Sequence, residues 1–76
     1  MDESKRLLAE ALRIGVERIG DEISMRDLPM WDSLGHMALI VLVEEHIEAT
    51  LSMDDIMAMT SLRGIAAVLE ARRSKA

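Results

Sequence analysis

Apolar residues recur at helical spacing in four segments of the chain. The first segment runs roughly from Ser4 to Ile19, and charged side chains fill the opposite helix face. Its apolar face comprises Leu7, Leu8, Ala11, Leu12, Val16 and Ile19. Asp2 and Glu3 stand at its start, where the helix dipole favours acids, and Gly20 is the expected stop. We therefore expect a first helix over residues 4–19.

A second helix should run from about Ser33 to Thr50, with Asp32 or Ser33 as its N-cap. Its pattern predicts an inward stripe of Met37, Ile40, Val43, Ile47 and Leu51. Gly35 lies in the first turn, where it costs about 1 kcal/mol relative to alanine.

Two further helical segments complete the chain. A short one of a turn or two spans Met53–Ala58 and begins with acids. Thr60 or Ser61 then caps a last helix, roughly Leu62 to Arg73. The expected inward stripe of this helix is Leu62, Ile65, Ala66 and Leu69. No segment shows the sustained alternation of a strand.

A long loop, Gly20 to Asp32, separates the first two helices. It contains the only proline and has no sustained period. Loops of this length are uncommon in small domains and tend to be functional or well anchored. Ile23, Met25, Leu28 and Trp31 are the expected anchors. The sequence thus predicts one all-α domain over residues 1–76, with a long loop after the first helix and a short third helix.

Composition bounds what such a domain can do. With 76 residues there is room for one thin core and none for a deep enzyme cleft. One Trp and seven Met stand in for the missing Phe and Tyr. Methionine usually just fills gaps, but it also suits a core that opens for a guest. The residues that could part in this way are Met37, Ile40, Val43, Met57, Met59 and Ile65.

Charge is unevenly distributed along the chain. Residues 1–31 hold seven acids and five bases, residues 32–62 hold six acids and no Lys or Arg, and residues 63–76 hold one acid and four bases. The acidic middle argues against nucleic acid as a partner, because phosphate binding needs clustered bases. It suits basic protein partners, although an acidic face that only keeps the protein soluble is also common.

Other classes are excluded by what the chain lacks. There is no Cys, so disulfides and thiolate metal sites are absent. The N-terminal segment has no apolar signal core, and the apolar run from Met37 to Val43 is too short to span a bilayer. We expect a cytoplasmic, monomeric protein.

Candidate chemistry gathers around Asp32, Ser33 and Leu34. Taken alone, Asp-Ser-Leu is an ordinary helix start, and most such serines only cap. Three contexts strengthen the signal here: the serine follows a long loop, opens a helix and begins the acidic block. A phosphate on Ser33 would meet the positive end of the helix dipole.

With these features the chain resembles the acyl carrier protein family over essentially its whole length. The resemblance rests on the loop, on Asp32-Ser33-Leu34, on Glu44-Glu45, on the short helix after Asp54-Asp55, and on Thr60-Ser61-Leu62. It implies a small four-helix bundle that is not an enzyme. It also implies that a phosphopantetheinyl transferase attaches 4'-phosphopantetheine from coenzyme A to Ser33, and that the thiol of this arm carries acyl groups as thioesters.

The resemblance further implies a docking surface for partner enzymes. In the family, acids of the second helix meet basic residues of acyl-loading, condensing and acyl-transfer enzymes. The matching positions here are Asp32, Leu34, Met37, Val41, Glu44, Glu45 and Glu48, with Ile56 from the short helix. Each exposed charge pair is worth little, about 0–1 kcal/mol, which suits brief contacts with many enzymes.

Two departures bear on the pathway. Fatty-acid carriers usually have Val-Glu where this chain has Met37-Ala38, so one recognition acid is lost. Gly35 and His36 replace polar or acidic residues. These changes favour a carrier in a specialised lipid or polyketide-like pathway over one in general fatty acid biosynthesis. An aminoacyl or peptidyl carrier of a nonribosomal-type pathway is the alternative.

Rival interpretations involve His36. Asp32 and His36 could share a helix face, but two ligands do not make a metal site and His46 lies elsewhere on the helix. Nucleophilic catalysis by Ser33 would also need an oxyanion hole and a pocket. His36 is then either a neighbour of a phosphate on Ser33, titrating near neutral pH, or a surface residue without a role. An unmodified acidic helical adaptor is the remaining class of function.

Overall fold

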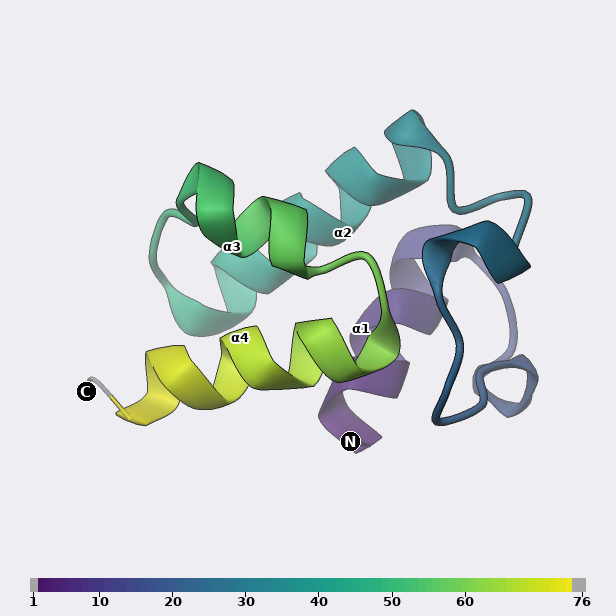
Figure 1. Cartoon of the computed structure of the whole chain (residues 1–76), viewed down its shortest axis with the longest axis horizontal. Coiled ribbons are helices and arrows are strands. Elements are labelled where there is room, and N and C mark those ends of the chain that lie inside the picture. The colour runs from purple at the N-terminus through teal and green to yellow at the C-terminus, as the bar shows by residue number, and fades with distance from the viewer. Residues whose placement is uncertain (1, 75–76) are drawn as a thin grey trace.

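The computed structural model describes residues 2–74, and every regular element in this range is helical (Figure 1). The elements are α1 (Asp2–Leu12), η1 (Val16–Arg18), η2 (Met25–Asp27), α2 (Ser33–Ile47), α3 (Met53–Ala58) and α4 (Leu62–Ser74), where η denotes a single 3₁₀ turn. The expected all-α bundle with a long first connection and a short third helix is confirmed. None of the helices within residues 2–74 is both long and apolar enough to cross a membrane.

Helix α1 is shorter than its periodicity predicted, because it ends at Leu12 and not at Ile19. Arg13 takes a left-handed backbone conformation, with φ of 58°. The N–H groups of Arg13 and Ile14 donate back to carbonyls of the last turn at 3.3 and 3.1 Å, which is the Schellman pattern of a helix end. The predicted stop at Gly20 was wrong because an arginine occupies the position where glycine is usual.

Helix α2 ends in a similar way. It stops at Ile47, before the predicted Thr50, and Glu48 is left-handed with φ of 55°. The N–H groups of Glu48 and Ala49 both donate to the carbonyl of Glu44. A non-glycine residue again ends the helix, so the sequence carried no strong stop signal.

The core is built from α1, α2 and α4, with help from the loops. Its fully or nearly fully buried members include Leu8, Leu12, Leu28, Trp31, Leu39, Val43, Leu51, Met59, Leu62, Ile65, Val68 and Leu69. Three of the four residues predicted to face inward from α4 are among them. Leu51 is buried as predicted, but from the connection after α2. Helix α3 contributes no buried residue and lies at the margin of the core.

The buried face of α2 differs from the prediction. Leu39 and Val43 are the buried residues of this helix, whereas Met37 is 62% exposed. Ile40 and Ile47 are partly buried against the core. Val43 was therefore placed correctly, Ile40 and Ile47 face the core in part, and Met37 was wrong. Apolar residues occupy most of the circumference of α2, so their period did not single out one face.

The methionines differ in burial, and not as predicted. Met59 is completely buried and is the methionine that fills the core. Met57 was predicted beside it but is 67% exposed, and Met53 is 69% exposed. Any adaptable part of the core therefore depends on Met59 and its aliphatic neighbours, whereas Met37, Met53 and Met57 lie at the surface.

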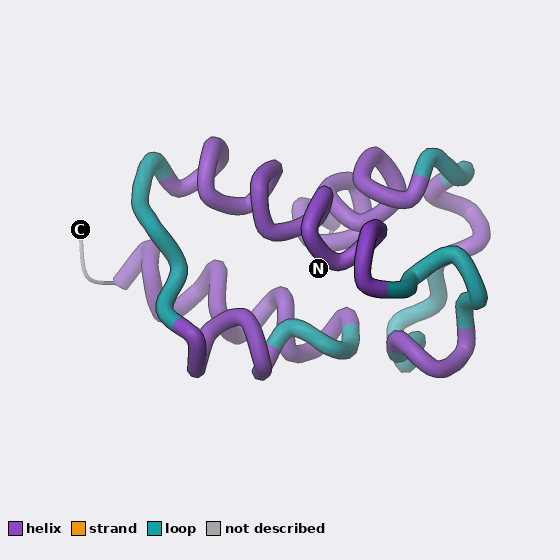
Figure 2. The backbone as a smooth tube through the Cα atoms, turned by 90° about the horizontal axis from the view of Figure 1, so that it is seen from above, coloured by secondary structure: helices purple, strands orange, loops and turns teal. Residues whose placement is uncertain are grey.

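The loop before α2 is anchored as predicted. Leu28 and Trp31 are buried, and Ile23 and Met25 pack against the core. The backbone of the loop also pairs with the connection between α3 and α4: the N–H of Met25 donates to the Thr60 carbonyl at 2.8 Å. Figures 1 and 2 show this loop gathered at the end of the molecule opposite the C-terminal end of α4.

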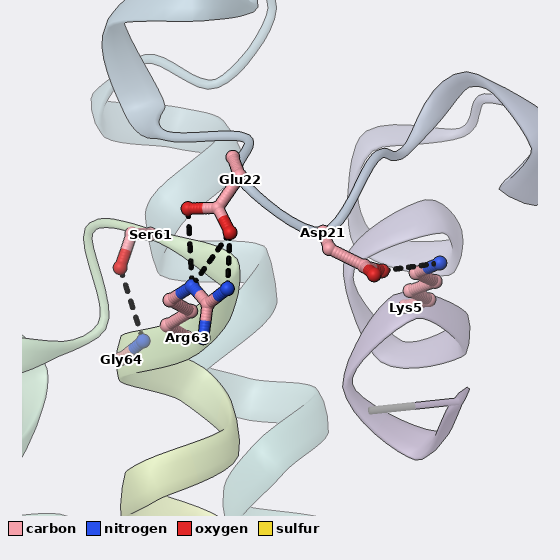
Figure 3. A network of polar contacts seen from close by, with 6 residues as sticks. All are labelled: Lys5, Asp21, Glu22, Ser61, Arg63 and Gly64. Atoms are coloured by element: carbon pink, nitrogen blue, oxygen red, sulfur yellow. Dashed lines mark hydrogen bonds and ion pairs between the residues drawn. The ribbon is translucent and has the colours of Figure 1, made fainter.

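Two ion pairs hold the start of this loop, as Figure 3 shows. The Lys5 ammonium of α1 lies 2.8 Å from the Asp21 carboxylate, and its hydrogen bond and charge lower the pKa of that carboxyl. The neighbouring Glu22 receives a bidentate contact from Arg63 of α4, which lowers the pKa of Glu22 in the same way. The loop that leads to Ser33 is thereby tied to two helices.

Gly64, in the first turn of α4, allows a close approach of backbone to backbone. A Cβ at this position would lie 1.9 Å from the Ala58 carbonyl oxygen. Gly64→Ala should therefore lower the free energy of unfolding by about 1–3 kcal/mol, measured by urea denaturation, despite the better helix propensity of alanine. Gly20→Ala is the matched control, because a Cβ there meets no atom within 4 Å. Equal stability of the two variants would contradict this packing.

Candidate functional site

Ser33 is the first residue of α2, and Asp32 is the N-cap. The Asp32 Oδ1 atom accepts the Gly35 N–H at 3.0 Å, and the Asp32 carbonyl accepts the His36 N–H at 2.8 Å, which is the first hydrogen bond of the helix. Of the two predicted caps, Asp32 therefore has this role. Because Asp32 accepts both of these hydrogen bonds, the Ser33 side chain is not needed to cap the helix.

The Ser33 side chain is exposed, and its hydroxyl makes no hydrogen bond to any residue in the range 2–74. The N–H groups of Ser33 and Leu34 likewise find no acceptor within this range. Such groups at the start of a helix carry its positive partial charge and donate readily to anions. The residues present therefore fit a phosphate ester on Ser33 without any rearrangement of the cap.

Gly35 explains how closely this first turn sits on the rest of the protein. A Cβ at Gly35 would lie 2.6 Å from the Met30 carbonyl oxygen and 2.8 Å from the Leu12 side chain. The sequence showed only a weak helix former here. In the structure, the missing side chain lets the start of α2 pack on the end of α1 and on the loop, which fixes the place of Ser33.

His36 has a structural role that neither of its two interpretations anticipated. The Trp31 indole N–H donates to His36 Nδ1 at 3.0 Å, and His36 Nε2 lies 3.1 Å from the carbonyl oxygen of Ile56 in α3. Both ring nitrogens are thus engaged. Because His36 is not free to act as a base for Ser33, the arrangement does not support a serine nucleophile.

A metal site at Asp32 and His36 is not supported either. The carboxylate of Asp32 is used in capping, and the imidazole of His36 is used as just described. Among residues 2–74, no group of three or more His, Cys, Asp or Glu side chains could hold a metal ion.

Most of the predicted docking residues of α2 share one face. At about 100° per residue, the five that lie within α2 fall within an arc of roughly 100°, and Glu48 follows directly after the helix. We call these six the docking face: Leu34, Met37, Val41, Glu44, Glu45 and Glu48. Leu34, Met37 and Val41 are 77%, 62% and 52% exposed, so three large apolar side chains of this face meet solvent, as at interaction sites. The face is apolar near Ser33 and acidic at its far end.

Glu44 differs from the other acids of the docking face. Its side chain is half-buried, and its Oε2 atom accepts the Leu51 N–H at 2.9 Å in the connection after α2. Glu45 and Glu48 are exposed. Glu44 thus organises the chain between α2 and α3, and the freely available acids are the other two.

Ile56 lies on α3, beside the start of α2, and is half-buried. Asp55 holds this short helix in place: it forms a capping box with Ser52 and an ion pair with Arg72 of α4. The hydrogen bond from the Ser52 backbone and the contact with Arg72 lower the pKa of Asp55. The Asp55 carboxylate therefore stays ionised to lower pH than an ordinary aspartate does, and its ion pair with Arg72 persists over the same range.

Comparison with known proteins places these features in one family. The family described as "Phosphopantetheine attachment site" matches residues 5–69, which includes α2, α3 and most of α1 and α4. No curated protein matches the chain. Members of this family hold 4'-phosphopantetheine covalently and are carriers, not catalysts. The protein therefore belongs to the phosphopantetheine-bearing carrier proteins of the acyl carrier family.

Proposed function

We propose that Ser33 is the residue that bears the phosphopantetheine arm, and that the protein presents acyl intermediates on it to partner enzymes. The observation that carries this proposal is the exposed, unbonded Ser33 hydroxyl at the start of an α2 helix that Asp32 already caps. Other serines at helix starts are occupied: the hydroxyls of Ser52 and Ser61 each accept a backbone N–H.

The residues around Ser33 have separate tasks in this function. Asp32 ends the loop and fixes the first turn of α2, and Gly35 lets that turn lie close to α1. The N–H groups of Ser33 and Leu34 are available to stabilise the negative charge of a phosphodiester. When bound, the arm supplies a terminal thiol on which acyl groups are held as thioesters, while the partner enzymes supply the bases and oxyanion donors.

The docking face supports recognition by enzymes with an apolar surface and a basic patch. These partners would be a phosphopantetheinyl transferase and enzymes that load, condense or transfer acyl groups. The apolar half of the face, from Leu34 to Val41, adjoins Ser33 and can be covered by an enzyme that approaches this serine. Glu45 and Glu48 can attract the basic patch from a distance.

The same surface favours a specialised pathway. Beyond Asp32, the first turns of α2 carry no acid, because Gly35 and Ala38 stand where fatty-acid carriers have recognition residues. The packing of Gly35 also leaves no room for a side chain there. Our hypothesis is a dedicated lipid or polyketide-like pathway. The alternative is an aminoacyl or peptidyl cargo, and loading assays with the two kinds of cargo would distinguish these hypotheses.

Intact mass spectrometry tests the proposed function. The chain should carry the added mass of one phosphopantetheinyl arm, either as purified or after incubation with coenzyme A and a phosphopantetheinyl transferase. Tandem mass spectrometry should place this mass on Ser33. A chain that lacks this mass both as purified and after incubation with an active transferase would contradict the proposal and favour an unmodified adaptor.

Charge reversal tests the acidic part of the docking face. Glu45→Lys combined with Glu48→Lys should lower kcat/KM of the transferase reaction at low salt about 5- to 30-fold, since exposed pairs contribute roughly 1–2 kcal/mol together. The loss should shrink as salt rises. Glu44 is left unchanged because its carboxylate holds Leu51.

The matched control for this pair is Glu10→Lys combined with Glu17→Lys. These two acids are exposed on α1 and η1, and the variant changes net charge by the same amount. It should react nearly as fast as wild type. Equal losses in both double variants would mean that net charge, and not the docking face, determines the rate.

A further inference from the structure

His36 joins three parts of the chain that are separate in sequence. Trp31 comes from the end of the loop, His36 from the first turn of α2, and Ile56 from α3. Trp31 is only 2% exposed, and its indole N–H is satisfied by His36. We call these three residues the His36 latch. The latch lies one helical turn from Ser33.

The chemistry of the two partners permits one form of the imidazole. An indole N–H can only donate and a backbone carbonyl can only accept. His36 Nδ1 must therefore lack a proton and Nε2 must carry one, which is the neutral tautomer. A second proton on Nδ1 would face the Trp31 N–H, so a charged His36 cannot keep this contact.

Helix α3 is the element that loss of the latch would affect most. It has only six residues, and none of them is buried. The Asp55 contact with Arg72 holds α3 to α4 and makes no contact with α2, whereas His36 holds Ile56 directly to α2. Elements with few buried contacts are the first to open locally. Ile56 of α3 packs against the apolar core, and the fully buried Met59 follows directly after the helix.

We propose that His36 is a positioning residue that closes α3 against the start of α2 when neutral and releases it when protonated. Release would open the margin of the core beside Ser33, so that shelter for an attached acyl chain depends on pH. The link to cargo rests on the proposed function of Ser33, but the latch itself does not. Histidine is suited to such a switch because its charge ordinarily changes between about pH 5 and 8.

Few charged residues lie next to the latch residues in the sequence. The loop contributes Asp32 next to Trp31, and α3 contributes Asp54 and Asp55, of which Asp55 is paired with Arg72. The acids of α2 lie two or more turns beyond His36. No Lys or Arg occurs in residues 32–62, and Arg72 of α4 contacts Asp55 and the Thr50 carbonyl there.

The test uses the unmodified protein and nitrogen-15 NMR. Because the chain has one Trp, a single indole N–H resonance reports the Trp31 contact. On titration from about pH 8 to pH 5, this resonance, the His36 ring protons and the backbone amides of Ile56 and Met57 should shift together with one midpoint. His46→Gln should behave like wild type, because His46 is the second histidine of the chain and contacts Glu3 instead.

His36→Gln removes the titrating group while keeping a donor and an acceptor. It should abolish the shared shift of the indole and α3 signals. An indole resonance in wild type that does not follow the His36 ring protons would overturn the proposal, as would an unchanged shift in His36→Gln. If His36→Gln fails to fold, the wild-type and His46→Gln titrations still decide the matter.

This experiment is independent of the proposed function. It requires no arm on Ser33, so an absent mass gain leaves its outcome intact. Conversely, failure of the titration would remove the latch and leave Ser33 as the attachment residue.

Discussion

Ser33→Ala should abolish attachment of the phosphopantetheine arm completely. The hydroxyl oxygen Oγ is the only non-hydrogen atom removed, and it is the atom that would form the phosphodiester bond. The fold should be unaffected, because Ser33 is exposed and Asp32 supplies the cap. Intact mass after incubation with coenzyme A and a transferase measures the loss, and far-UV circular dichroism verifies the fold.

Ser52→Ala is the matched control for this experiment. Ser52 is also an exposed serine at the start of a helix, but its hydroxyl caps α3. The variant should gain the full mass of the arm while losing about 0.5–2 kcal/mol of stability through the missing cap. A mass gain in Ser33→Ala equal to that of wild type would refute Ser33 as the attachment residue.

Leu39→Ala should be among the most destabilising single changes in the protein. Leu39 is completely buried, so truncation removes apolar contacts and leaves a cavity, at a cost of about 2–5 kcal/mol. That is a large share of the roughly 5–15 kcal/mol typical of whole domains. Urea denaturation followed by circular dichroism measures this loss.

Met37→Ala provides the comparison that makes this prediction discriminating. Met37 lies on the same helix and is also a large apolar residue, but it is 62% exposed. Its truncation should change stability by no more than about 0.5 kcal/mol, as for other surface positions. The opposite order of effects would restore the inward stripe that the sequence suggested and contradict the structure.

The contrast between Met37 and Leu39 shows when a sequence pattern fails to identify the buried face of a helix. A pattern identifies a buried face only when the other faces are polar. In α2 the exposed side near Ser33 is itself apolar, so the surface that partners would cover looks like core in the sequence. The misplaced stripe and the proposed docking face therefore have the same physical origin.

Signals carried by a few adjacent residues predict this structure better than the apolar periodicity predicts where helices end. The short third helix was predicted at its observed bounds, Met53–Ala58, and Asp32 was one of two expected caps. Both depend on side chains that bond to nearby backbone. The ends of α1 and α2 were missed because Arg13 and Glu48 occupy left-handed positions that usually select glycine.

In the candidate site, too, features encoded by adjacent residues could be predicted, whereas contacts between distant residues could not. Asp32 and Ser33 could be identified because the signal lies within a few adjacent residues. The contact of His36 with Ile56 joins positions twenty apart in sequence, and that of Glu44 with Leu51 crosses a helix end. Such pairs depend on how the chain after α2 turns back toward this helix, which no periodicity encodes.

On the docking face, the acids that would attract a basic enzyme lie far from Ser33, where the proposed attachment takes place. Glu45 lies twelve residues beyond Ser33, which is about 18 Å along a helix. An enzyme held mainly by the acidic end could rotate about this contact, which lies far from the serine. The apolar end could then settle at slightly different angles on different enzymes, so one short helix could be shared by a set of active sites of unequal depth.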